Sequence, residues 1–219
     1  MTIKAVLFDH DGTIVDSEAI HYDLWNELLQ RHNIHIPLAE FETKFVGLPS
    51  AAISAHIARD YECALTAEEL FIEKNTMVKA YLSQNAFPLI HDALAVIQSL
   101  KNAGFTLAVV TGAPKLNIES TVREYELAPY FDAVVCGYDV ENNKPAPDPY
   151  LLAVEQLGLS VDDCVAIEDS ETGLLSAHRA GIRCLTIETA LTPHHNLEHS
   201  VKHCTNLTEV EQWIVSNNV

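Results

Sequence analysis

Basic residues are scarce in this 219-residue sequence, which has 13 lysines and arginines against 31 aspartates and glutamates, a formal net charge of −18. Nucleic acids and anionic membranes are bound chiefly through lysine and arginine, so this balance argues against either as a partner. A phosphorylated metabolite would be repelled as well, unless a bound metal ion or a placed lysine supplied positive charge locally. The charge therefore restricts where an anion can bind without excluding one.

Cysteines are few, and long apolar runs are missing. The five cysteines are an odd number, widely scattered and without a Cys-x-x-Cys pair, which indicates buried thiols in a reducing compartment. No apolar run approaches the roughly 18 residues that span a bilayer. The apolar N-terminal stretch is broken at Asp9, too early for a signal peptide. We predict a soluble, cytoplasmic globular protein, either a monomer or a weak dimer.

What the sequence does contain is an alternation of short apolar runs with helical patterns, which is typical of βαβ units around a parallel sheet. The runs are almost continuously hydrophobic, as expected for strands covered on both faces. Between them, Ser170 can cap a helix and Gly158 can close one. The predicted strands are residues 5–8, 105–110, 133–136, 164–167 and 184–187. The predicted fold class is α/β, with a Rossmann-like parallel sheet.

One segment interrupts this alternation directly after the first strand. From about residue 17 to residue 85 no strand pattern is convincing, and apolar residues recur at helical spacing, as at Ile20, Leu24 and Leu28. Ser50 and Thr66 are plausible starts of further helices. We predict two domains, an α/β core of residues 1–15 and 88–219 and a helical insertion of residues 16–87.

Reactive side chains follow the first predicted strand, which runs into Asp9-His10-Asp11-Gly12-Thr13. The motif has two carboxylates two residues apart and a glycine that permits a tight turn. In open α/β sheets ligands bind at the carboxyl ends of the strands, and the N–H groups of such a turn can face an anion. Taken alone, the motif is a weak signal, because turn and capping carboxylates also produce it.

The ends of the other strands strengthen this signal. The second predicted strand runs into Thr111-Gly112 and the fourth into Glu168-Asp169, while Lys144 lies in the loop after the third. Acids gathered at one edge repel one another and raise one another's pKa. A bound cation resolves this conflict. Carboxylate ligands without histidine or cysteine favour Mg²⁺, which commonly also binds a substrate phosphate.

In their order along the chain these motifs resemble those of the haloacid dehalogenase-like hydrolase superfamily, in its phosphatase and phosphomutase branch with a helical cap. The resemblance extends over roughly residues 1–190 and includes Lys144-Pro145 and Glu168-Asp169-Ser170, with Gly173 beyond. It implies Mg²⁺-dependent hydrolysis of a small phosphorylated metabolite, such as a sugar phosphate or a phosphoglycolate-like molecule.

The resemblance also implies roles for the four acids. Asp9 would be the nucleophile that forms an aspartyl-phosphate, and Asp11 would be the general acid and base. The metal would bind Asp9, the main-chain carbonyl of Asp11 and Asp169, with Glu168 as a further ligand or as the holder of a metal-bound water. The dehalogenase branch lacks the second aspartate, so Asp11 favours phosphate esters over haloacids.

By the same resemblance, the remaining motif residues would bind the phosphoryl group. Thr111 would donate a hydrogen bond to a phosphoryl oxygen, and Lys144 would pair with Asp9 and with charge on the transferring group. Gly12 and Gly112 would line the substrate phosphate through their backbone.

The helical insertion would be a cap that excludes water and selects the substrate. His21 resembles a histidine of mutase-like members that helps to position the acid, and Lys74 is a further candidate for substrate contact, although both are also ordinary helix residues. The nearest alternative function is a phosphomutase of the β-phosphoglucomutase type. Mutases, however, carry an arginine where this chain has Leu48-Pro49-Ser50, and small polar residues where it has Gly112-Ala113-Pro114.

Four further histidines have no role in these motifs. His195, His199 and His203 are spaced by four residues, which on a helix would stack three imidazoles as a conceivable zinc site, although solvated histidines are commoner. His10 stands where the family usually has an apolar residue. We expect it to point into the sheet as a core histidine rather than to line the site.

Two other classes of protein are compatible with some of these residues. A signalling receiver module combines acids, a phospho-accepting aspartate, a threonine and a lysine, but its accepting aspartate ends the third strand and it needs no cap. A catalytically silent binding protein has no need to retain all four of Asp9, Asp11, Lys144 and Asp169.

Overall fold

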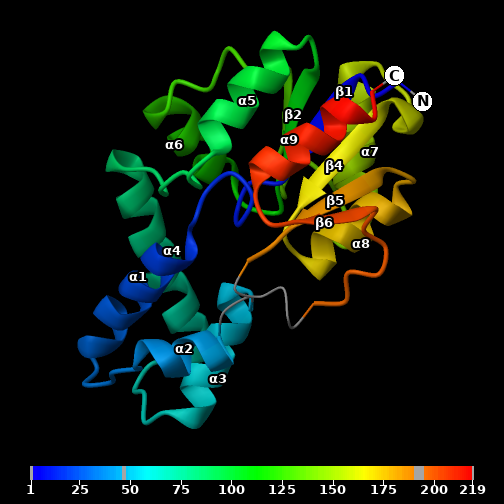
Figure 1. Ribbon diagram of the computed structural model, residues 1–219. Helices are drawn as coiled ribbons and strands as arrows, with labels where there is room; N and C mark the ends of the chain where they lie inside the picture. Colours follow the sequence, from blue (N-terminus) through cyan, green and yellow to red (C-terminus); the bar gives the residue numbers. More distant parts are fainter. Residues whose placement is uncertain (1, 46–47, 190–194, 219) are drawn as a thin grey trace. The chain divides into compact units, whose positions relative to one another are not determined.

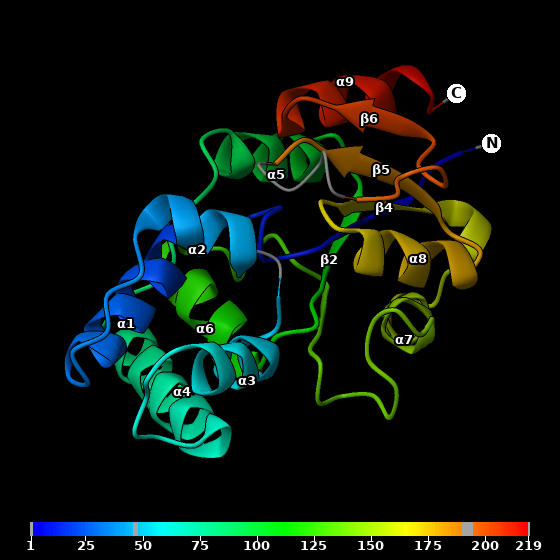
Figure 2. The same cartoon turned by 90° about the horizontal axis from the view of Figure 1, so that it is seen from below.

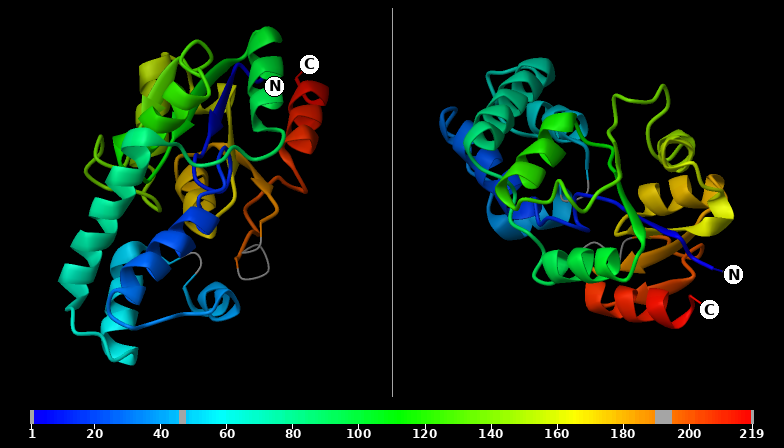
Figure 3. Two further views of the ribbon diagram at one scale, coloured as in Figure 1. Left: turned by 90° about the vertical axis from the view of Figure 1, so that its left-hand side faces the viewer. Right: turned by 90° about the horizontal axis from the view of Figure 1, so that it is seen from above.

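The computed structural model describes residues 2–45, 48–189 and 195–218. The chain divides into two compact units, one made of Met1–Asp16 and Phe87–Val219 and the other of Ser17–Ala86 (Figure 1). The two ends of the chain lie side by side in the first unit (Figure 3), where the Ile3 amide donates to Asn218 Oδ1 (2.7 Å).

The first unit is built on a six-stranded sheet in the order β3-β2-β1-β4-β5-β6, and every neighbouring pair is parallel. All four residues of β1 are fully buried, because helices cover both faces of the sheet. The predicted α/β, Rossmann-like fold is confirmed. The strands are β1 (Ala5–Phe8), β2 (Thr106–Val110), β3 (Ala133–Val135), β4 (Cys164–Glu168), β5 (Arg183–Ile187) and β6 (Lys202–Cys204).

Helices cover the sheet in two layers (Figure 2). On one face, α5 and α9 contact each other and the strands; on the other, α7 and α8 do the same. Two helix ends follow the sequence prediction: Ser170 Oγ accepts from Gly173 N–H at the start of α8, and Gly158 closes α7 in a left-handed conformation. The helices of this unit are α5 (Ala93–Asn102), α6 (Lys115–Glu124), α7 (Asp148–Leu157), α8 (Glu171–Arg179) and α9 (Leu207–Ser216), with a 3₁₀ turn at Val161–Asp163.

Strand β6 is absent from the sequence-based prediction. Two of its three residues, Lys202 and His203, are exposed, so no apolar run marks it. The strand forms because it lies parallel to β5, with Thr186 beside His203. A lysine on such an edge strand discourages pairing with another chain.

The second unit is helical and has a core of its own, which includes Trp25, Phe41 and Leu70. Thr66 begins the longest of its helices with a reciprocal capping box to Glu69. Among the described residues, none of the helices combines the length and hydrophobicity that crossing a membrane requires. The helices are α1 (Glu18–Gln30), α2 (Leu38–Lys44), α3 (Ser50–Asp60) and α4 (Ala67–Gln84).

Candidate active site

The carboxyl ends of the central strands bring the predicted motifs together. In the parallel register, Phe8 of β1 lies beside Val109 of β2 and Ile167 of β4. The residues that follow these three therefore leave the sheet at the same edge, where open α/β sheets bind ligands. The pairing continues one step into the motif, because the Asp9 N–H donates to the Ile167 carbonyl (2.9 Å). Motifs more than a hundred residues apart thus become neighbours through the order of the strands.

Lys144, from the loop between β3 and α7, reaches this edge from the side. Its Nζ donates to Asp9 Oδ1 at 2.5 Å, to Glu168 Oε1 at 2.7 Å and to the Val110 carbonyl at 2.8 Å. Burial alone lowers the pKa of Lys144, but the adjacent carboxylates of Asp9 and Glu168 outweigh it, so its pKa is raised. The lysine is therefore a fixed positive charge within the site.

Three buried carboxylates form a group that can hold a cation. Carboxylate oxygens of Asp9, Glu168 and Asp169 lie within 4.8 Å of one another. Burial raises the pKa of Asp9 to about 7, with Glu168 adding to the effect and Lys144 opposing it. Burial also raises the pKa of Asp169 well above its usual range, followed by the charges of Asp9 and Glu168. Three acids and one ammonium leave excess negative charge, and an oxygen-only donor set fits a hard divalent cation.

Two glycines allow the backbone to approach these acids. A Cβ on Gly12, which has φ +80°, would lie 2.1 Å from Asp169 Oδ2, and one on Gly173 would lie 2.0 Å from the Glu168 carboxylate. A side chain at either position would displace an acid. Gly12 belongs to the first motif, whereas Gly173 lies in the first turn of α8.

The loop after β2 holds Thr111 and Gly112. The Thr111 side chain is buried, and its hydroxyl accepts a hydrogen bond from the Ala113 N–H (3.0 Å). The Gly112 carbonyl accepts from Asn143 Nδ2 (3.0 Å), and Asn143 Oδ1 accepts from the Lys144 N–H (2.8 Å). Asn143 therefore ties the loop that carries Lys144 to the loop that carries Thr111. Its position beside Lys144 was the only sequence signal for this role.

Tyr150 of α7 is a second residue that the sequence reasoning missed. It is fully buried, and its hydroxyl donates to Glu168 Oε1 (2.6 Å). The Lys144 Nζ lies 5.3 Å from the centroid of its ring. Burial, followed by the charge of Glu168, raises the pKa of the Tyr150 phenol well above its usual range, so the phenol remains a hydrogen-bond donor.

Asp11 lies outside the three-carboxylate group, and its side chain is 31% exposed. Its Oδ2 is 3.1 Å from His10 Nδ1. His10 is fully buried, as expected for a core histidine, but it also contacts this site residue. The burial agrees with the predicted core histidine, and the contact with Asp11 adds a link to the site.

His21 and Lys74 lie together within the helical unit. Lys74 of α4 is fully buried, with its Nζ 3.1 Å from His21 Nδ1 and 5.3 Å from the centroid of the Trp25 ring. Burial lowers the pKa of Lys74 to about 8. Lys74 is thus a buried lysine and not an ordinary exposed residue of a helix.

The three C-terminal histidines do not form a common site in the described part of the chain. His195 Nδ1 lies 3.3 Å from the Asp169 carbonyl oxygen, His199 stacks on His178 with ring centroids 3.9 Å apart, and His203 Nδ1 contacts Thr186 Oγ1 at 2.6 Å. They lie on loop and strand, so the four-residue spacing that aligns side chains on a helix has no effect here. The conceivable zinc site is not supported.

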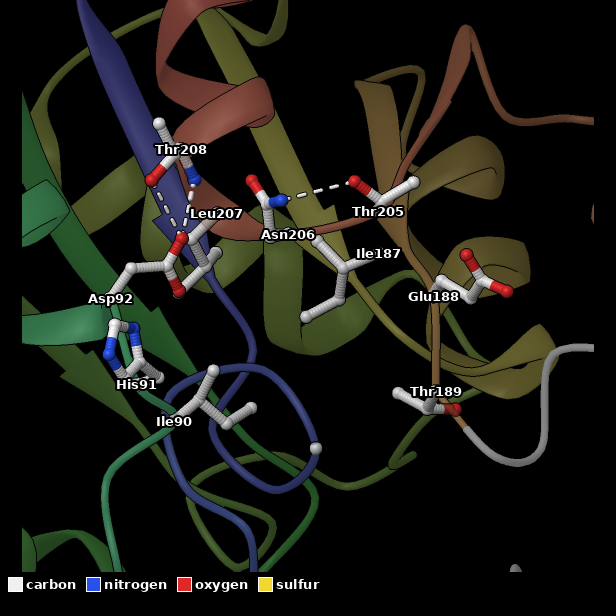
Figure 4. A pocket seen from close by; sticks show the side chains of 11 residues that line it. Ile90, His91, Asp92, Ile187, Glu188, Thr189, Thr205, Asn206, Leu207 and Thr208 are labelled. Atoms are coloured by element: carbon white, nitrogen blue, oxygen red, sulfur yellow. Dashed lines mark hydrogen bonds between the residues drawn. The ribbon is translucent and has the colours of Figure 1, made fainter.

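Figure 4 shows a cavity of about 370 Å³ near the ends of β5 and β6. It lies beside the acidic group, because Gly12 lines it and also lies against Asp169. Gly12 belongs to its lining, whereas the side chains of Asp9, Lys144 and Asp169 do not. On its far wall, Asp92 accepts two hydrogen bonds of 2.8 Å from the amide and hydroxyl of Thr208. The cavity is therefore a neighbour of the acidic group and not its interior.

The parallel sheet and the acidic, lysine-bearing group at its carboxyl edge define an α/β protein of the Rossmann-like type, with a site suited to a cation and an anionic substrate. A family model described as "Haloacid dehalogenase-like hydrolase" matches residues 6–187. The chain therefore belongs to the haloacid dehalogenase-like hydrolase family, as the motifs predict. The expected class of enzyme, a phosphoric monoester hydrolase, is confirmed by relatives that are named as phosphatases.

Two such relatives and one solved structure illustrate the similarity. Fructose-1-phosphate phosphatase YqaB of Escherichia coli is 30% identical over 83% of this chain and 95% of its own length. Phosphorylated carbohydrates phosphatase of Thermotoga maritima is 28% identical over 82% of both chains. The crystal structure of CbbY from Rhodobacter sphaeroides in complex with phosphate has a TM-score of 0.78, with 26% identity over 95% of this chain and 96% of that one.

Proposed function

We propose that this protein is a Mg²⁺-dependent phosphatase that hydrolyses a sugar phosphate through an aspartyl-phosphate on Asp9. The observation that carries the proposal is the position of the Asp9 carboxylate, 2.5 Å from the Lys144 ammonium and within 4.8 Å of Glu168 and Asp169 oxygens. A carboxylate in that setting has a cation to orient it and a metal-binding group beside it. Mg²⁺, held by Asp9, Asp169 and the Asp11 carbonyl with Glu168 as ligand or water holder, would neutralise charge on the phosphoryl oxygens.

In the first half-reaction an Asp9 oxygen attacks phosphorus, and the bond from phosphorus to the sugar oxygen breaks. Asp11 gives its proton to the departing oxygen, so that an alcohol rather than an alkoxide leaves. Lys144 stabilises the negative charge that gathers at the transferring group, and the Thr111 hydroxyl and the Gly12 and Gly112 backbone orient it.

In the second half-reaction water attacks the same phosphorus atom. Asp11, now ionised, takes a proton from the water, and the bond between phosphorus and Asp9 breaks. Inorganic phosphate leaves, and both aspartates return to their starting states. Two easier steps replace one difficult displacement.

Phosphorylated sugars are the proposed substrate class, because relatives from two organisms carry them in their names. Fructose 1-phosphate is the first compound to test, and phosphoglycolate is the second. His21 and Lys74 of the helical unit remain predicted substrate contacts. A cytoplasmic monomer or weak dimer remains the predicted state of the enzyme.

The test measures phosphate release from a panel of sugar phosphates and phosphoglycolate, with Mg²⁺ and with EDTA. Asp9→Asn should lose about 10⁴-fold or more in turnover, as expected for a missing nucleophile. Asp11→Asn should lose on the order of 10²-fold to 10⁴-fold, as expected for a missing general acid. Asp162→Asn is the matched control, since Asp162 is an exposed acid at the opposite end of β4. Near-normal turnover in Asp9→Asn would rule out the covalent mechanism.

The same panel separates hydrolysis from a phosphomutase, the less supported alternative. A mutase that is given its hexose phosphate would yield the isomeric phosphate and little inorganic phosphate. We expect release of inorganic phosphate equal to the substrate consumed. A coupled assay for glucose 6-phosphate formed from β-glucose 1-phosphate detects the other outcome.

A further inference from the structure

His10, the residue between the two aspartates of the first motif, joins the site to a helix far away in the sequence. Its Nε2 lies 3.0 Å from Thr121 Oγ1, and its Nδ1 lies 3.1 Å from Asp11 Oδ2. The Thr121 hydroxyl donates to the Asn117 carbonyl (3.2 Å), so the hydrogen shared with His10 comes from the ring Nε2. Both ring nitrogens are therefore engaged, one toward helix α6 and the other toward Asp11.

The backbone of His10 is held as firmly as its ring. The His10 carbonyl accepts hydrogen bonds from the amides of Ile14 (2.8 Å) and Val15 (3.0 Å), which close the loop that carries Asp11. The ring and Thr121 are both fully buried. The imidazole is thus a rigid support with neither exposure nor rotational freedom.

Asp11 differs from this support, because its side chain is only partly buried, at 31% exposure. We infer that His10, anchored by Thr121, positions the Asp11 carboxyl for proton transfer to and from the substrate oxygen. The inference rests on the proposed function, in which Asp11 is the acid and base. With the shared proton on His10 Nδ1, Asp11 Oδ2 accepts it in both half-reactions, and Oδ1 is left to give a proton to the departing oxygen and to take one from water.

Leaving-group dependence distinguishes positioning of an acid from general support of the fold. A sugar alkoxide is a poor leaving group and needs the proton from Asp11, whereas p-nitrophenolate departs readily without one. For a reaction with a covalent intermediate, kcat/KM reports the steps up to departure of the leaving group. A misplaced Asp11 therefore lowers kcat/KM for a sugar phosphate much more than for p-nitrophenyl phosphate.

Two substitutions of similar polarity each preserve one half of the His10 bridge. In His10→Asn the amide occupies the place of Nδ1 and can still reach Asp11. In His10→Gln the longer amide occupies the place of Nε2 and can still reach Thr121. Thr121→Val removes the anchoring hydroxyl while keeping the shape of the side chain, and Thr121→Ser restores the hydroxyl.

The experiment compares kcat/KM of these variants for p-nitrophenyl phosphate and for the sugar phosphate that the panel shows to be hydrolysed fastest. For His10→Gln we expect a loss on the order of tenfold to 10²-fold with the sugar phosphate, as for a catalytic group displaced by about 1 Å, and a clearly smaller loss with the aryl ester. His10→Asn should retain more activity than His10→Gln. Thr121→Val should show a weaker loss of the same kind, and Thr121→Ser should recover it.

Equal losses on both substrates, or none, would overturn the role of His10 while leaving the phosphatase intact. Wild-type protein that hydrolyses neither substrate would refute the proposed function itself. Urea unfolding of each variant tells which of them fold. If His10→Gln does not fold, Thr121→Val and Thr121→Ser are compared instead. The deciding quantity is again the ratio of kcat/KM for the sugar phosphate to kcat/KM for p-nitrophenyl phosphate.

Discussion

Removing the Asp9 carboxylate should stabilise the metal-free protein, and the gain should depend on pH. Asp9 is only 7% exposed, and burial followed by the charge of Glu168 raises its pKa from 3.8 to about 7. The folded state thus binds the Asp9 proton more tightly than the unfolded chain does. The stability that results is fully present below the unfolded pKa and is lost as the pH rises through about 7. Asparagine has no such proton to lose, so Asp9→Asn escapes the loss.

The magnitude follows from the shift of about 3 pKa units, at about 1.4 kcal/mol for each unit. Asp9→Asn should therefore exceed wild-type protein in free energy of unfolding by up to about 4 kcal/mol at pH 8 without metal. At pH 5.5 wild-type Asp9 is still largely protonated in the folded state, so the advantage should be about 2 kcal/mol smaller.

The assay is urea unfolding in EDTA at pH 5.5 and pH 8, with Asp162→Asn as the matched carboxylate control. Adding Mg²⁺ at a hundred times Kd should narrow the difference at pH 8, because binding stabilises the wild-type fold by about 2.7 kcal/mol and Asp9→Asn has lost a ligand. An Asp9→Asn protein less stable than wild type at pH 8 in EDTA would contradict the reasoning. So would an advantage that does not change with pH.

Three further outcomes follow from the same geometry. Lys144→Met leaves the buried carboxylates of Asp9 and Glu168 without their ammonium. We expect the free energy of unfolding in urea to fall by about 3–5 kcal/mol and turnover to fall at least about 10²-fold. A variant as stable as the wild type would show that the ion pairs are dispensable. Gly12→Ala places a Cβ 2.1 Å from Asp169 Oδ2 in a backbone with φ +80°, so the Asp169 carboxylate must shift. Calorimetry should therefore find weakened Mg²⁺ binding. Unchanged affinity would contradict the proposal that Asp169 binds the metal. EDTA should abolish phosphate release and Mg²⁺ should restore it, whereas turnover indifferent to chelation would contradict the proposed metal.

The features predicted correctly from the sequence are those that depend on residues close together along the chain. Apolar runs that are buried on both faces marked five of the six strands, and cap residues such as Thr66 and Ser170 marked helix starts, since these signals act within a few residues. The candidate site followed because strand ends of a parallel sheet share one edge, which made Asp9 and Lys144 candidates before any contact was known.

Strand β6 marks the limit of that reasoning, since two of its three residues are exposed and only the neighbouring β5 makes them a strand. The three C-terminal histidines mark another limit, because their spacing has meaning only on a helix that does not form there. The periodicity of a sequence predicts local structure, but it does not identify the distant residue that pairs with a given strand or side chain.

The parallel α/β sheet was predictable from local pattern alone, and the same pattern supplied the helical insertion and the strand-end side chains as predictions. The contacts between distant residues required the folded chain: the hydrogen bond from Tyr150 to Glu168, the contacts of His10 with Thr121 and Asp11, and the burial that raises the pKa of Asp9 to about 7. Each of these depends on atoms separated by up to 159 positions along the chain, as between Asp9 and Glu168. Hydrogen bonds and desolvation act over a few ångströms, and those distances exist only once the strands have taken their places.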